Sequence, residues 1–199
     1  MFSGATRHAA EVDGIMFFIV LSSAILLVLI TIAMIYFTIR YNKKRNPVAT
    51  NIEGNTILEV VWIAIPTILV LFMFYYGYVS FADTRSIPKD AMNVKVLGKM
   101  WVWSFTYANG KTSDTLYLPS GKAIKLDLLT SDVNHGFFVP AFRIKEDCIS
   151  GKQNYMVIYP DKTGEYDIFC SEYCGMNHSS MYTKMKVVSE SEFNSWLKK

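Results

Sequence analysis

The sequence predicts a two-helix transmembrane hairpin followed by an all-β sandwich that ends in a short helix. Two observations carry this prediction. Two long apolar runs lie near the N-terminus, and short segments with alternating apolar and polar residues fill most of the remainder. The composition agrees, since 51% of the 199 residues are hydrophobic, which is more apolar than a typical soluble domain.

The hairpin rests on two spans, residues 15–39 and 57–79. The first carries no charged residue, and about 25 apolar residues suffice for a helix to cross the hydrocarbon core of a membrane. The second is interrupted only by Glu59 and Pro66. The first span is too long for the apolar region of a signal peptide, and no small-residue cleavage site follows it. We therefore expect residues 1–81 to form a transmembrane hairpin.

The loop at residues 40–56 is basic, whereas the tail before the first span has Arg7 as its only Lys or Arg. The positive-inside rule places such a loop in the cytoplasm. Both termini are then expected on the outer side of the membrane. The net charge of +3 is small, and no basic patch interleaved with aromatic residues indicates a nucleic-acid partner.

A polar stretch at residues 82–91 is expected to be a linker to a second domain, residues 92–199. Segments 93–96 and 122–128 alternate, and further short segments are rich in β-branched and aromatic residues. Turn signals separate them, as is typical of a sandwich or barrel. The capping-box pattern of residues 189–192 then predicts a short amphipathic helix packed on the sandwich.

The richest cluster of potential metal ligands is the segment from Cys170 to Met181, which also holds Cys174 and His178. Thiolate and thioether sulfurs select copper(I), zinc or iron–sulfur clusters. With His135 upstream, one Cys, one His and one Met would suit a mononuclear blue-copper site. The second Cys favours a dinuclear copper centre in which both thiolates bridge the two ions, with electron transfer as its function.

Two other interpretations of the segment are open. A disulfide between Cys170 and Cys174 is permitted outside the membrane, but it would leave His178 and Met181 without a role. A structural zinc site can use two Cys and two His, but it leaves the thioether and the hairpin unexplained. Cys148 is expected to be a small buried hydrophobic residue.

The combination of Asp132-Val133-Asn134-His135 with Cys-Ser-Glu-x-Cys-Gly-x-x-His-x-x-Met resembles the CuA site of cytochrome c oxidase subunit II. The resemblance implies a cupredoxin-like sandwich in which two thiolates bridge two copper ions and each of two imidazoles caps one of them. It implies a weak axial thioether on one copper and a backbone carbonyl on the other. The implied ligands are His135, Cys170, Glu172 (through its carbonyl), Cys174, His178 and Met181.

The resemblance assigns roles to three further groups. It implies that the Glu172 carboxylate binds a magnesium or manganese ion at the interface with subunit I, where a solvated loop carboxylate is the alternative. It implies that Trp101 receives electrons from cytochrome c, while Trp103 and Phe105 belong to the core. It implies that Glu59 lies at the cytoplasmic mouth of a proton path, where a carboxylate that merely reaches water is the alternative.

The function implied is that of subunit II of a proton-pumping haem–copper terminal oxidase. Electrons come singly from a c-type cytochrome and pass to haem in subunit I, where dioxygen is reduced to water. The chain has no Cys-x-x-Cys-His, so haem is expected only on partner polypeptides. Subunits of quinol oxidases typically lack these copper ligands, and nitrous oxide reductase is soluble. A membrane-tethered module that delivers copper is a further alternative, but it would need neither Trp101 nor Glu59.

One departure from the family pattern concerns the cytochrome donor. Acidic residues that attract basic cytochromes are scarce here, since Asp114 is the only acid from Gly98 to Thr115. Electrostatic steering of the donor is therefore expected to be weak. We expect a donor that docks mainly through apolar contacts or is held nearby by a tether.

Overall fold

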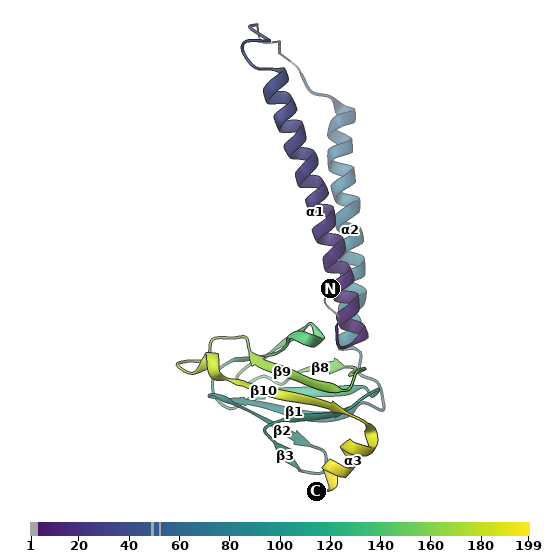
Figure 1. The fold of residues 1–199 in the computed structure, drawn as a ribbon, viewed down its shortest axis with the longest axis vertical. Helices are drawn as coiled ribbons and strands as arrows, with labels where there is room; N and C mark the ends of the chain where they lie inside the picture. The colour runs from purple at the N-terminus through teal and green to yellow at the C-terminus, as the bar shows by residue number, and fades with distance from the viewer. Residues whose placement is uncertain (1–3, 49, 52) are drawn as a thin grey trace. The chain divides into compact units, whose positions relative to one another are not determined.

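The computed structural model describes residues 4–48, 50–51 and 53–199, so residues 49 and 52 of the predicted basic loop lie outside it. The chain divides into two compact units. One is the helical hairpin at Gly14–Val79, and the other combines residues 4–13 with Ser80–Lys199. Figure 1 shows the order of the elements along the chain.

Two long apolar helices form the first part of the chain, α1 (Arg7–Arg40) and α2 (Thr56–Arg85). Both are long and apolar enough to cross a membrane. Asn55 caps α2, because its side-chain oxygen accepts a hydrogen bond from the Leu58 N–H at 3.1 Å. Most apolar side chains of the two helices are exposed, as expected of helices whose natural surroundings are lipid or other membrane subunits.

The remainder is a sandwich of two five-stranded sheets. One sheet has the order β3-β2-β1-β5-β8, and its strands are β1 (Met92–Lys99), β2 (Val102–Tyr107), β3 (Thr112–Ser113), β5 (Ile124–Thr130) and β8 (Asn154–Ile158). The other has the order β4-β10-β9-β6-β7, and its strands are β4 (Leu116–Pro119), β6 (His135–Val139), β7 (Ile144–Cys148), β9 (Gly164–Cys170) and β10 (Tyr182–Val188). Both the apolar helices and the predicted all-β sandwich are therefore confirmed.

Alternating residues of both sheets fill the core. Val94 and Val96 of β1 are fully buried while Lys95 between them is exposed, which is the period of two expected of a strand with one face inward. Trp103 and Phe105 are buried as predicted. Cys148 is fully buried too, and burial raises the pKa of its thiol to about 12.

The chain ends in α3 (Glu190–Lys198), which confirms the predicted short helix. The Ser189 hydroxyl accepts a hydrogen bond from the Glu192 N–H at 3.3 Å, as the capping-box pattern predicts. Phe193 is buried against the sandwich, and Trp196 stacks on Tyr117 with ring centroids 4.3 Å apart.

The residues that precede the first membrane span belong to the sandwich unit. The Ala5 N–H donates to the Ala141 carbonyl at 3.0 Å, and both Ala5 and Ala9 are buried. The Asp13 carboxylate accepts a hydrogen bond from Arg143 Nε at 2.8 Å. Helix α2 continues to Arg85 and so includes residues 82–85, the first part of the predicted linker. Arg85 pairs with Glu146 of the sandwich. The non-helical part of the linker is therefore shorter than predicted.

Candidate metal centre

Two neighbouring strands bring the distant ligands together. His135 begins β6 and Cys170 ends β9, and these strands pair antiparallel with Phe137 opposite Cys170. The loop that follows β9 returns to its own start, because the Cys170 N–H donates to the Met181 carbonyl at 3.1 Å. A short 3₁₀ turn, His178–Ser180, lies within this loop.

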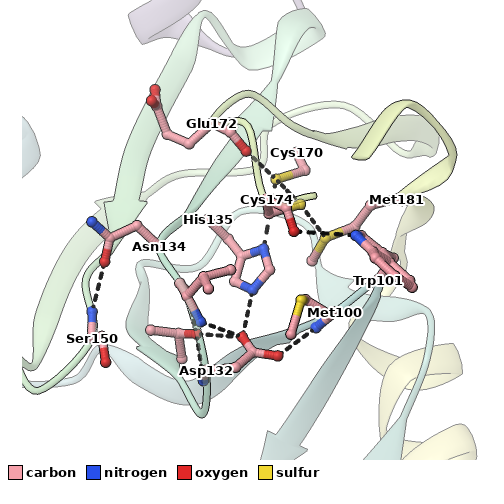
Figure 2. Close-up of polar contacts among 12 residues, drawn as sticks. Met100, Trp101, Asp132, Asn134, His135, Ser150, Cys170, Glu172, Cys174 and Met181 are labelled. Atoms are coloured by element: carbon pink, nitrogen blue, oxygen red, sulfur yellow. Dashed lines mark hydrogen bonds and ion pairs between the residues drawn. The ribbon is translucent and has the colours of Figure 1, made fainter. Parts of the chain in front are cut away.

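The other four predicted donors lie around the two thiols, and Figure 2 shows three of them, from His135, Glu172 and Met181. The Sγ atoms of Cys170 and Cys174 are 3.7 Å apart. Around Cys170 Sγ lie His135 Nδ1 at 3.8 Å and the Glu172 carbonyl oxygen at 3.2 Å. Around Cys174 Sγ lie His178 Nδ1 at 3.6 Å and Met181 Sδ at 3.8 Å. Each thiol therefore has one imidazole and one weaker donor of its own.

The thiols are not joined as a disulfide. Their separation is much longer than a sulfur–sulfur bond, which measures about 2.0 Å. Cys148, Cys170 and Cys174 are all free. Burial and the hydrogen bond with Cys170 raise the pKa of the Cys174 thiol to about 11. A metal that binds here must therefore displace protons from the thiols.

The donor set fits a pair of copper ions. His135, Cys170 and Cys174 place ligand atoms within 4.8 Å of one another, so this buried cluster can hold a metal ion. A structural zinc site takes four ligands in a tetrahedron, whereas six donors converge here. Soft thiolates and a thioether, together with imidazoles, suit copper.

His135 is fully buried, and its surroundings leave the ring little freedom. A side-chain Cβ at Gly98 would lie 3.0 Å from His135 Cδ2, so the ring packs directly on the backbone of β1. Its Nε2 lies 2.8 Å from Asp132 Oδ1. Burial opposes the ionisation of Asp132, but hydrogen bonds from the Met100 N–H, His135 and the Val133 N–H outweigh it and lower the pKa of this carboxyl to about 2.

The ligand loop, residues 171–181, packs on Gly136, the residue after His135. The Ser171 N–H donates to the Gly136 carbonyl at 3.0 Å. A Cβ at Gly136 would lie 2.1 Å from Ser171 Oγ and 3.0 Å from Glu172 Cγ. The absence of a side chain here therefore allows Glu172 to reach its place beside Cys170.

Trp101 and Trp103 occupy different environments, although residues two apart in a strand would lie on the same face. Trp101 is partly exposed, and its Nε1–H donates to the Cys174 carbonyl at 3.2 Å (Figure 2). Its ring also lies 3.4 Å from the Cβ position of Gly175, whose φ is +117°. Trp103 is buried and packs edge-on against Phe137, with ring centroids 5.5 Å apart. Of these two tryptophans, Trp101 is the one that combines partial exposure with a hydrogen bond to the ligand loop.

The two functional carboxylates that the sequence singles out lie in separate units. Glu172 turns its carbonyl to Cys170, while its carboxylate points away (Figure 2). The carboxylate pairs with Lys145 Nζ at 2.6 Å. Glu59 lies in the first turn of α2 and is exposed, with Oε1 3.0 Å from the Cβ position of Gly54. Neither the Lys145 partner nor the Asp132–His135 contact was predicted. The only sequence signal for Asp132 was its place in the motif before His135.

Comparison with known proteins agrees with both parts of the chain. The transmembrane domain of cytochrome c oxidase subunit II matches residues 1–81, and the periplasmic domain of the same family matches residues 110–188. An alternative cytochrome c oxidase subunit 2 from Bradyrhizobium diazoefficiens is 32% identical over 82% of this chain and 71% of its own length. A cytochrome c oxidase subunit 2 from Alkalihalophilus pseudofirmus is 33% identical over 86% of this chain and 54% of its own length.

A solved structure extends the comparison to the fold. The periplasmic domain of subunit II of the cytochrome oxidase of Bradyrhizobium japonicum superposes with a TM-score of 0.53 at 33% identity. The match covers 57% of this chain and 95% of that domain, so the sandwich is cupredoxin-like as predicted. With matches to both its membrane helices and its outer domain, the chain belongs to the cytochrome c oxidase subunit II family.

Proposed function

We propose that this chain is the subunit that receives electrons for a proton-pumping haem–copper oxidase. It would accept them one at a time from a c-type cytochrome and pass them to haem in subunit I, where dioxygen is reduced to water. The observation that carries the proposal is the arrangement of four further donors around two thiols 3.7 Å apart. Bound there, a copper pair supplies a one-electron redox centre.

The six residues would bind copper in three different ways. Cys170 and Cys174 would bridge the two ions, and His135 and His178 would each cap one. Met181 and the Glu172 carbonyl would be the weaker ligands. Because strands β6, β9 and β10 hold the ligand loop at its base, the ligands are positioned before the metal arrives, which favours a site that changes little between oxidation states.

Trp101 is the proposed point of electron input. One hydrogen bond links its indole to the peptide of Cys174, so a short path connects a partly exposed ring with a bridging thiolate. The membrane hairpin would place this surface on the outer side, with the basic residues after α1 in the cytoplasm. Glu59, at the start of α2, would then lie near the cytoplasmic face, where an ionisable group can admit protons.

The donor is proposed to dock mainly through apolar contacts. Exposed apolar side chains lie close in sequence to Trp101 or to a proposed ligand: Met100, Val102, Val133, Tyr173, Met176 and Tyr182. The two nearest acids are engaged, since Asp132 accepts from His135 and Glu172 pairs with Lys145. The association rate of the donor should therefore fall little as ionic strength rises. A steep fall would contradict apolar docking.

The Glu172 carboxylate is the proposed contribution of this chain to a magnesium or manganese site shared with subunit I. It points away from the thiols, and a hard carboxylate suits such an ion. The Lys145 ammonium holds the same carboxylate in this structure, so the divalent ion must displace Lys145 or use the second carboxylate oxygen.

Copper loading of the full-length chain in detergent tests the central proposal. We expect two copper ions per chain, a purple colour, and paramagnetic coupling to two equivalent copper nuclei. Cys174→Ser should abolish this signal, whereas Cys148→Ala should keep it, because Cys148 is buried in β7 outside the donor set. A colourless protein or a mononuclear signal would overturn the proposal. Rapid transfer of the copper to a metal-free acceptor would instead favour a delivery module.

A further inference from the structure

Asp132 connects the candidate copper ligand His135 to the segment that carries Trp101. It lies in the turn between β5 and β6 (Figure 2). Its Oδ1 is 2.8 Å from His135 Nε2, and its Oδ2 accepts a hydrogen bond from the Met100 N–H at 2.8 Å. One carboxylate therefore joins the imidazole of a candidate ligand to the backbone N–H of Met100, the residue directly before Trp101.

The carboxylate is held in place by its own turn. The Val133 N–H donates to Oδ1 at 2.8 Å, and the Thr130 hydroxyl donates to the same oxygen at 3.2 Å. Asn134, two residues after Asp132, is held by a separate hydrogen bond, because the Ser150 N–H donates to Asn134 Oδ1 at 2.9 Å. Asp132 is thus oriented by the protein and does not point into solvent as a free acid.

The contact decides which nitrogen of His135 carries a proton. An ionised carboxylate can only accept hydrogen bonds, so the imidazole must donate from Nε2. In a neutral ring this leaves the lone pair on Nδ1, the nitrogen that faces Cys170 Sγ at 3.8 Å. Partners of this kind commonly fix the orientation of metal-binding histidines.

We propose that Asp132 is a positioning residue: it holds His135 as the Nε2–H tautomer and ties that ring to the segment that receives electrons. An acid beside such a site could instead attract a basic cytochrome, but the carboxylate oxygens of Asp132 are already engaged inside the protein. The electron-transfer part of this inference rests on the proposed function. The tautomer part does not, because it concerns the chain before copper binds.

The tautomer can be read directly in the copper-free, full-length chain with ¹⁵N-labelled histidine. The chain has three histidines, so substitution of His8 and His178 in turn assigns the remaining ring. We expect the wild type to show His135 protonated at Nε2, and Asp132→Ala to show a mixture of tautomers. Asp132→Asn should retain the wild-type form, because its amide oxygen can still accept. Asp114→Asn, at an exposed acid, is the matched control.

The copper-loaded chain gives the second measurement. Asp132→Ala should slow electron transfer from the donor by about 10- to 100-fold and alter the imidazole nitrogen coupling, while Asp132→Asn should stay close to wild type. The salt dependence of donor association should be the same in all variants. An Nδ1–H tautomer in the wild type overturns the inference even if Asp132→Ala does not fold. A wild type that binds no copper pair overturns the proposed function and leaves the tautomer result standing.

Discussion

The indole of Trp101 donates a hydrogen bond to the backbone carbonyl of Cys174, with 3.2 Å between Nε1 and O. This contact joins a partly exposed aromatic ring in the turn between β1 and β2 to the ligand loop that follows β9. The ring also covers Gly175, where a Cβ would meet it at 3.4 Å. The indole is therefore in direct contact with the peptide that carries one of the two thiols.

Replacement of Trp101 by Phe should remove the hydrogen bond and weaken the path from the donor. We expect electron input to slow by about tenfold or more, equal to about 1.4 kcal/mol of barrier, with the copper spectrum unchanged. Stopped-flow oxidation of the reduced donor by the copper-loaded protein measures this. Trp103→Phe is the control, because Trp103 is buried. That variant should lower stability and leave the electron input of the folded protein near wild type. Equal rates for wild type and Trp101→Phe would exclude the proposed route.

Gly98→Ala tests how tightly the backbone of β1 packs on the imidazole. The new Cβ would lie 3.0 Å from His135 Cδ2 and 3.2 Å from Trp103 Cζ3, so one of the rings must shift. Overpacking of this kind costs about 1–3 kcal/mol, and we expect a lower midpoint of unfolding together with weaker copper binding. Gly77→Ala is the control, since nothing lies within 4 Å of its Cβ position. Unchanged copper affinity in Gly98→Ala would show that the ring has more freedom than its packing indicates.

Most of the fold, and the clustering of the six proposed copper donors, could be predicted because they depend on local patterns. The apolar runs, the alternating strands and the spacing from Cys170 to Met181 are all features of short segments. The partners of the site were not predictable in this way. Asp132 meets Met100, and Lys145 meets Glu172, only after the sheets have formed. The same holds for Ala5 and Asp13 of the tail before the first span, whose contacts with Ala141 and Arg143 no local pattern indicates.

Low pH should lower the free energy of unfolding of the sandwich, because Asp127 of β5 becomes protonated. Burial opposes ionisation of this carboxyl, but hydrogen bonds with Lys125, whose Nζ is 2.7 Å away, and with Asn93 outweigh it and lower its pKa. A group whose pKa is lowered by folding stabilises the native state above its unfolded value of about 3.9 and loses that contribution as the pH falls through the native value. Thermal unfolding of the copper-free chain from pH 7 to pH 3 should show this loss. Asp127→Asn should be less stable at pH 7 and depend less on acid. The exposed Asp114→Asn should follow the wild type, and identical pH profiles for all three proteins would contradict this role.

Substitution of Glu172 should distinguish the proposed copper pair from the proposed magnesium or manganese site. Its backbone carbonyl faces Cys170 Sγ at 3.2 Å, while its carboxylate lies apart, against Lys145. In the assembled oxidase, Glu172→Gln should therefore abolish bound manganese, measured by its paramagnetic signal, and leave the copper signal unchanged. Lys145→Met should have the opposite effect on manganese, because it removes a competitor for the carboxylate. Both side chains of this pair are roughly half exposed, at 49% and 40%, so solvent screens their attraction. The gain in manganese affinity should thus be small. Loss of the copper signal in Glu172→Gln would show that the side chain, and not only the carbonyl, supports the copper pair.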